Sequence, residues 1–206
     1  MSNSTITLYA TPLSGHAHRV EQLLLLLGLE YGYSEANAGV RATPEFLALN
    51  PLGQIPVLRD GDLVLLDSNA IMVYLVGRYA PDSGWIPADA LGAARMQRWL
   101  SVAAGELCYG PAAARVASMR GQPEVRERAQ TVARRILPVL DQELSTRAFL
   151  AADTPTLADL ACYAYVAVAP EGGLPLAPFP HLRAWIERLE AMPGFKPMQR
   201  SPELET

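Results

Sequence analysis

The segment from Asn50 to Leu58, Asn-Pro-Leu-Gly-Gln-Ile-Pro-Val-Leu, constrains the fold more than any other part of the chain. Asn-Pro and Gly predict a turn, and the apolar residues from Val57 onward predict the start of a strand. A proline that opens a strand after such a turn is expected to be a cis-proline. A cis bond at Pro56 would turn the backbone N–H and C=O of Ile55 outward, where an extended peptide can pair with them as an added strand.

An acid and a hydroxyl follow shortly after this segment, at Asp67 and Ser68. They stand where the next helix should begin, and a helix N-terminus favours a charged ligand end. Together the two segments predict a site for a peptide ligand.

The composition predicts a globular protein without a nucleic-acid partner. Of the 206 residues, 50% are apolar and 18% are charged, which is enough for one sizeable core or two small ones. The formal charge of −4 and the lack of a lysine and arginine cluster argue against nucleic acid. Leu23–Leu27 is too short to span a bilayer, and the N-terminus lacks a basic signal region. We therefore expect no membrane association and a cytoplasmic location.

The cysteines and histidines predict neither a disulfide framework nor a metal site. Cys108 and Cys162 lie far apart in apolar helical context, which is typical of buried structural thiols. His16 and His18 are two residues apart, so their side chains do not face each other on a helix. No carboxylate or thiol nearby completes a set of ligands.

The first third of the chain predicts a thioredoxin-like domain with the order βαβαββα. The apolar residues alternate between the strand period and the helix period, and Asp60-Gly61-Asp62 has the chemistry of a hairpin turn. The predicted elements are a strand Ile6–Tyr9, a helix Gly15–Leu27, a strand Glu30–Ala36, a helix opening at Pro44, strands Ile55–Arg59 and Leu63–Leu66, and a helix ending near Tyr79.

The rest of the chain predicts an all-helical domain. Residues 81–91 are rich in helix breakers and form the linker between domain 1–80 and domain 92–206. Gly105, Gly110 and Pro111 interrupt the first long helix, so we expect a kink there. The predicted helices are Ala93–Val116, Pro123–Thr146, one opening at Thr156, and Leu182–Met192 after the proline break at 178–180.

The loop after the first strand carries the candidate for chemistry. Ser14 stands at the first turn of the following helix, where a hydroxyl and the helix dipole both favour an anion. A bound thiol would lose its proton more readily there, and the thiolate is the useful nucleophile. Equally, Ser14 could simply cap the helix, since serine is a preferred cap.

These motifs resemble the cytosolic glutathione S-transferases, and most of all the bacterial serine-type, theta-like members. The resemblance rests on Leu-Ser-Gly-x-x-x-Arg-Val in the first loop, Asn-Pro-x-Gly-x-Ile-Pro, and Asp-Ser-x-Ala-Ile. It implies that Ser14 donates a hydrogen bond to the glutathione sulfur, with Thr11 as the alternative donor. Tyr9 is expected to point into the core instead.

The resemblance also implies how glutathione would lie. The backbone of Ile55 would pair with the cysteinyl part, and Gln54 would face the ligand backbone or the glycyl carboxylate. Asp67 would receive the γ-glutamyl ammonium and Ser68 its carboxylate, with His16 close to the ligand.

One position in this set departs from the family. Relatives often have arginine where this chain has Asn69. Arg41, expected in the loop before the second helix, could supply a compensating charge or could be an ordinary solvated residue. Arg19 is expected to form a salt bridge with Glu21 or with the helical domain.

The helical domain predicts two further features. Thr156 and Asp159 match the capping box that members of this family carry in the core of that domain, which is structural. The interrupted helix lies over the glutathione cleft in relatives. Leu107, Tyr109 and Arg115, together with Leu13, are therefore candidates for an electrophile pocket, with ordinary helix packing as the alternative.

The sequence leaves three functions open. The first is a homodimeric transferase that conjugates glutathione to small apolar electrophiles. The second is a glutathione-dependent disulfide reductase or peroxidase, which would use the same thiolate. The third is a binding protein without turnover, because a fold alone does not establish chemistry.

Overall fold

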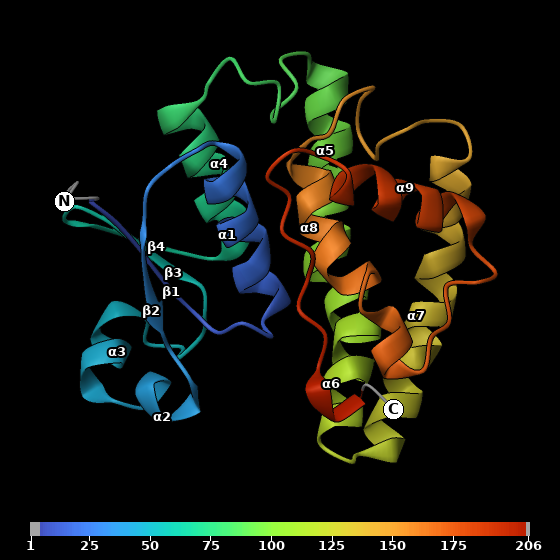
Figure 1. The fold of residues 1–206 in the computed structure, drawn as a ribbon, viewed down its shortest axis with the longest axis horizontal. Coiled ribbons are helices and arrows are strands. Elements are labelled where there is room, and N and C mark those ends of the chain that lie inside the picture. Colours follow the sequence, from blue (N-terminus) through green and yellow to red (C-terminus); the bar gives the residue numbers. More distant parts are fainter. Residues whose placement is uncertain (1–4, 205–206) are drawn as a thin grey trace. The chain divides into compact units, whose positions relative to one another are not determined.

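The computed structural model describes residues 5–204, apart from the side chain of Glu203, and divides the chain into two compact units. The first unit ends at Pro81 and the second begins at Asp82. The first contains, in order, β1 (Ile6–Ala10), α1 (Gly15–Leu26), β2 (Gly32–Glu35), α2 (Ala38–Arg41), α3 (Pro44–Leu49), β3 (Val57–Asp60), β4 (Leu63–Leu66) and α4 (Ser68–Tyr79) (Figure 1). The predicted thioredoxin-like fold is confirmed.

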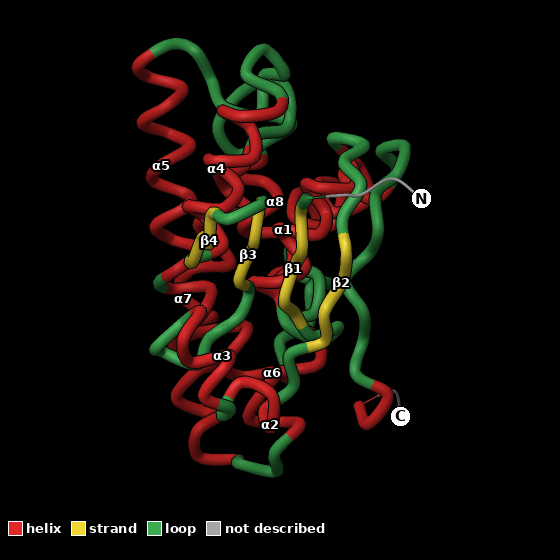
Figure 2. The backbone as a smooth tube through the Cα atoms, turned by 90° about the vertical axis from the view of Figure 1, so that its left-hand side faces the viewer, coloured by secondary structure: helices red, strands yellow, loops and turns green. Residues whose placement is uncertain are grey.

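The four strands form one mixed sheet with the order β2-β1-β3-β4 (Figure 2). β1 pairs with β2 in parallel and with β3 antiparallel, and β3 pairs with β4 antiparallel. The register places Val57 opposite both Tyr9 and Leu66. The ends of β1 and β4 and the start of β3 therefore meet at one edge of the sheet, and the residues that follow or precede them gather there.

The two long helices of the first unit, α1 and α4, cover the same face of the sheet (Figure 1). Their apolar faces join the strand residues in one core, whose fully buried members include Leu8, Leu23, Leu58, Ile71 and Leu75. On the opposite side, Phe46 of α3 packs with Ala36 and Val57. Tyr9 contacts this smaller cluster, with its ring edge-on to Phe46 at 6.3 Å between centroids.

One short element of this unit was not predicted. α2 spans four residues, so it offers no helical periodicity to find in the sequence. Its one local signal is Asn37, whose side chain caps the helix by accepting a hydrogen bond from Val40 N. Arg41 therefore ends a helix and does not lie in a loop, and β2 is shorter than the predicted strand 30–36.

The second unit is helical, as predicted. It consists of α5 (Ala90–Ala104), a π-helical turn (Cys108–Ala112), α6 (Ala113–Met119), α7 (Pro123–Leu144), α8 (Leu157–Val166), α9 (Pro180–Glu190) and two 3₁₀ turns, Ala169–Gly172 and Pro202–Leu204. The expected kink is the π-helical turn. A Cβ at Gly110 would lie 3.0 Å from the backbone N of Ala133, so glycine permits this close approach to α7. Pro180, predicted as part of a break, instead starts α9, where its missing N–H costs nothing.

Asp159 organises the core of the second unit. It lies at the start of α8, a helix whose residues are all buried. Its carboxylate accepts hydrogen bonds from the backbone of Leu150 (2.9 Å) and of Thr156 (2.8 Å) and from the indole of Trp185 (3.0 Å). The capping box with Thr156 is thus extended to a loop and to α9.

Among the described residues, no helix is long and apolar enough to cross a membrane.

We expect Asp159→Ala to lower the free energy of unfolding by roughly 3 to 5 kcal/mol. The substitution leaves three buried N–H donors without an acceptor, and each such loss costs about 1 to 3 kcal/mol. Urea denaturation of the purified protein measures the effect. The control Asp153→Ala removes an exposed carboxylate nearby and should change stability by less than about 0.5 kcal/mol. Equal stability of the two variants would contradict the role given to Asp159.

Candidate functional site

Ser14 is the N-cap of α1, at the edge of the sheet where β1 ends. Its backbone is extended (φ −82°, ψ 115°), and its Oγ accepts a hydrogen bond of 3.2 Å from Ala17 N. The loop before it is closed by a bond from Ser14 N to Thr11 O (3.1 Å). A hydroxyl that accepts one hydrogen bond still has its own hydrogen to donate. The two alternatives for Ser14, helix cap and sulfur donor, are therefore compatible.

Three other predicted residues lie close to Ser14 in the chain, two of them in the loop and one in the first turn of α1. Thr11, Leu13 and His16 are all partly exposed. The carbonyl of Thr11 accepts the hydrogen bond from Ser14 N that closes the turn.

The loop before β3 presents a free backbone edge. The Ile55–Pro56 bond is cis, and within residues 5–204 neither the N–H nor the C=O of Ile55 forms a hydrogen bond. Asn50, which is buried, shapes the loop by donating from Nδ2 to Gln54 O (2.9 Å) and accepting from Leu52 N (3.1 Å). The Gln54 side chain is exposed beside this edge. An extended peptide could pair with Ile55 as an added strand.

The turn from β4 into α4 presents an exposed carboxylate. Asp67 adopts a positive φ of 68°, which is rare for a residue other than glycine and marks a constrained position. Its Oδ1 caps α4 by accepting from Asn69 N (2.9 Å) and Ala70 N (3.0 Å). Oδ2 accepts no hydrogen bond from the described residues, so the exposed carboxylate can receive a cation.

Ser68, the first residue of α4, is buried beside two side chains of α1. Its Oγ lies 3.1 Å from His16 Nδ1 and 3.5 Å from Arg19 Nη1. Burial and the charge of Arg19 lower the pKa of His16 to about 4, with Asp67 acting in the opposite direction. The imidazole is therefore neutral at pH 7 (the pKa of a free histidine being about 6.5).

The contacts of Arg19 were missed by sequence reasoning. Arg19 is fully buried, and its Nη1 donates to Asn69 Oδ1 at 3.1 Å as well as to Ser68. One signal in the sequence could have associated Arg19 with the site. His16 and Arg19 are three residues apart, so they share one face of the helix. Arg41, the other candidate for a compensating charge, instead donates to Gly53 O at 3.5 Å.

The predicted electrophile residues of the second unit have different surroundings. Tyr109 is 70% exposed, whereas Leu107 is fully buried. Arg115 is buried and forms an ion pair of 2.7 Å with Glu171, and it also donates to Gln199 O at 2.8 Å. These internal contacts hold Arg115 in the helical core, and the role of all three residues toward an electrophile stays a prediction.

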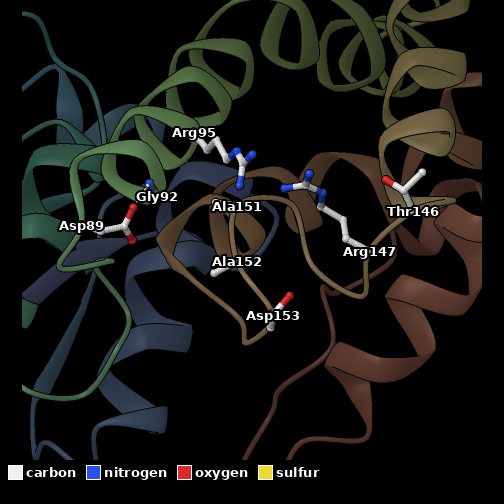
Figure 3. Close-up of a pocket in the computed structure, with 8 residues that line it drawn as sticks. All are labelled: Asp89, Gly92, Arg95, Thr146, Arg147, Ala151, Ala152 and Asp153. Carbon is white, nitrogen blue, oxygen red and sulfur yellow. Dashed lines mark hydrogen bonds between the residues drawn. The ribbon is translucent and has the colours of Figure 1, made fainter.

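The second unit also contains a polar cavity of about 320 Å³. The guanidinium groups of Arg95 and Arg147 point into it from opposite sides, and Asp89 and Asp153 lie along its rim (Figure 3). None of the predicted electrophile residues lines it. Its charged lining does not suit an apolar electrophile.

Among the described residues, no group of three histidine, cysteine or acidic side chains is placed to hold a metal ion.

Comparison with protein families matches both units of the chain. The glutathione S-transferase N-terminal domain matches residues 4–77, and the glutathione S-transferase C-terminal domain matches residues 98–193. Glutathione S-transferase 3 of Zea mays is 34% identical over 208 residues, covering 93% of this chain and 91% of its own length. Glutathione S-transferase GstB of Escherichia coli K12 is 30% identical and covers 96% and 99%.

Solved structures agree with these relatives. A glutathione S-transferase from Pseudomonas fluorescens superposes with a TM-score of 0.85 at 29% identity and covers 96% of this chain and all of its own (100%). A theta-class glutathione S-transferase from Xanthomonas axonopodis pv. citri, solved with glutathione bound, has a TM-score of 0.83 at 25% identity and covers 96% and 99%.

The neutral state of His16 predicts a pH dependence of stability. Below pH 6.5 the unfolded chain protonates this histidine, whereas the folded protein does so only near pH 4. The wild type should therefore lose free energy of unfolding relative to His16→Gln as the pH falls through this range, by up to roughly 3 kcal/mol. Urea denaturation of both proteins from about pH 7 to pH 4 measures the difference. A difference that stays constant with pH would contradict the burial of a neutral imidazole.

Proposed function

Because the chain belongs to the glutathione S-transferase family, we propose that it transfers the glutathione thiolate to small apolar electrophiles, with Ser14 as the catalytic hydroxyl. The observation that carries the proposal is that Ser14, Ile55, Asp67 and Ser68 gather at one edge of the sheet. They offer a hydroxyl, an unpaired peptide edge and an acid-serine pair, which match the thiol, the cysteinyl backbone and the γ-glutamyl end of glutathione.

Thiol activation follows from the position of Ser14. The N-terminus of α1 carries partial positive charge, and the Ser14 hydroxyl donates to sulfur while its oxygen keeps the cap with Ala17 N. Both interactions favour the thiolate over the thiol, so the bound thiol becomes roughly 10- to 100-fold more acidic than in water. Thr11 is the alternative donor.

The other parts of the proposal rest on the family. Gln54 faces the glycyl end, His16 lies beside the γ-glutamyl end, and Leu13, Leu107, Tyr109 and Arg115 remain the residues proposed for the electrophile. The protein acts as a homodimer in the cytoplasm and requires glutathione but no metal.

Ser14→Gly is the sharpest test of the catalytic hydroxyl. Glycine at an N-cap costs only a few tenths of a kcal/mol relative to serine, so the helix start is kept while the hydroxyl is lost. We expect kcat/KM for glutathione with an aryl halide to fall at least about 10-fold, since one charge-assisted hydrogen bond is removed. At saturating glutathione, the pH profile of kcat/KM for the aryl halide reports the pKa of the bound thiol, and it should shift upward as thiolate stabilisation is lost.

Thr11→Val is the matched control. It should change kcat/KM by less than about twofold and leave the pH profile unshifted. If Thr11→Val has the large effect and Ser14→Gly the small one, Thr11 is the donor and the role of Ser14 is wrong.

The disulfide reductase is the second candidate, and the same assay separates it. Both cysteines of the chain, Cys108 and Cys162, belong to the second unit, so none stands in the loop of Ser14 to form a mixed disulfide. Glutathione itself would have to resolve the intermediate. We expect aryl halide conjugation to exceed reduction of a small disulfide, and the reverse order would favour the reductase.

A further inference from the structure

The buried charge of Arg19 acts on the part of the site where Ser68 lies. Arg19 projects from α1 with no exposed surface, and its Nη1 donates both to Asn69 Oδ1 (3.1 Å) and to Ser68 Oγ (3.5 Å). Both partners belong to the first turn of α4. A guanidinium held away from water favours negative charge nearby. Because Arg19 is fully buried, it acts on a ligand through the residues that it contacts, Ser68 and Asn69 among them.

These contacts decide which hydrogen-bonding role remains for Ser68. A guanidinium has donors and no acceptor, so Arg19 uses the Ser68 oxygen as an acceptor. His16 Nδ1 lies 3.1 Å from the same oxygen, and a neutral imidazole can donate from that nitrogen. Arg19 therefore occupies one acceptor position of the Ser68 oxygen. In the tautomer of His16 that carries its hydrogen on Nδ1, the imidazole occupies the other, and the Ser68 hydroxyl then donates its own hydrogen to a ligand. The partner that fits such a donor is an acceptor with negative charge.

We propose that Arg19 is a positioning residue that makes Ser68 selective for the α-carboxylate of the γ-glutamyl group. The inference rests on the proposed function, because it assigns the specificity of that same site. The guanidinium of Arg19 replaces the charge that relatives often carry at the position of Asn69. In this chain the charge comes from α1, and Asn69 serves as the acceptor that holds the guanidinium beside Ser68.

The test compares glutathione with cysteinylglycine, a dipeptide that has the same thiol but lacks the γ-glutamyl group. In the wild type, Arg19 should lower the KM for glutathione and have no effect on the KM for cysteinylglycine. We expect Arg19→Met to raise the KM for glutathione at least about 10-fold with kcat within about twofold, since a charge-assisted contact is lost in binding. The kcat/KM for cysteinylglycine should change less than about twofold.

Asn69→Asp is the second variant and keeps the buried arginine in place. The new carboxylate retains the oxygen that accepts from Arg19 but neutralises its charge. We expect a rise of roughly 3- to 10-fold in the KM for glutathione and none for cysteinylglycine. Arg59→Met, which removes an exposed arginine at the far end of β3, is the control for net charge and should change neither value.

The outcomes separate this inference from the proposed function. If the variants impair both thiols equally, or neither, Arg19 serves only the fold and the inference is wrong. If Arg19→Met does not fold, Asn69→Asp decides alone. If the wild type shows no turnover with glutathione and no glutathione binding by calorimetry, the proposed function fails before the variants are compared.

Discussion

The candidate site depends on the register of three strands. β3 pairs with β1 on one side and β4 on the other, so Tyr9, Val57 and Leu66 stand in one row. The chain leaves β1 and β4 at this row to start a helix, and it enters β3 at the same row. Two helix N-termini and one unpaired peptide edge therefore meet, although their residues lie far apart in the sequence. A slip of one residue would turn each side chain to the other face of the sheet and dissolve the site.

The electrostatics of this edge combine a buried cation and two helix N-termini with one carboxylate at the surface. The N-terminus of α1 and the capped turn of α4 provide partial positive charge, and Arg19 adds a full charge behind them. Asp67 provides the opposite charge at the surface of the same turn. This pairing of an inner cation with an outer carboxylate matches a ligand end that carries both an ammonium and a carboxylate. The neutral His16 fits the same arrangement, because a second cation beside Arg19 is unfavourable.

Local signals in the sequence were sufficient for most of the fold. The turn at Asn50–Gly53, the hairpin at Asp60–Asp62 and the capping box at Thr156 are each specified by neighbouring residues, and each appears in the structure. The family resemblance added what a ligand at the sheet edge would be. α2 was not predicted, because four residues carry no periodicity.

Contacts between distant residues could not be predicted in the same way. The spacing of His16 and Arg19 places both on one face of α1, but the enclosure of Arg19 by Ser68 and Asn69 depends on how α1 packs on α4. The same holds for Asp159, whose hydrogen bonds to Leu150 and Trp185 join a loop and α9 to the start of α8. Sequence patterns predict which residue types a site would use, and packing determines which partners those residues have.

A crystal structure with glutathione bound would show whether the thiol lies at the N-terminus of α1. We expect the tripeptide to lie extended along Ile55, with backbone hydrogen bonds to the N–H and C=O of that residue. Its sulfur should lie within hydrogen-bonding distance of Ser14 Oγ, and its γ-glutamyl carboxylate should accept a hydrogen bond from Ser68. Glutathione bound elsewhere, or bound here with its sulfur turned away from the N-terminus of α1, would contradict this expectation.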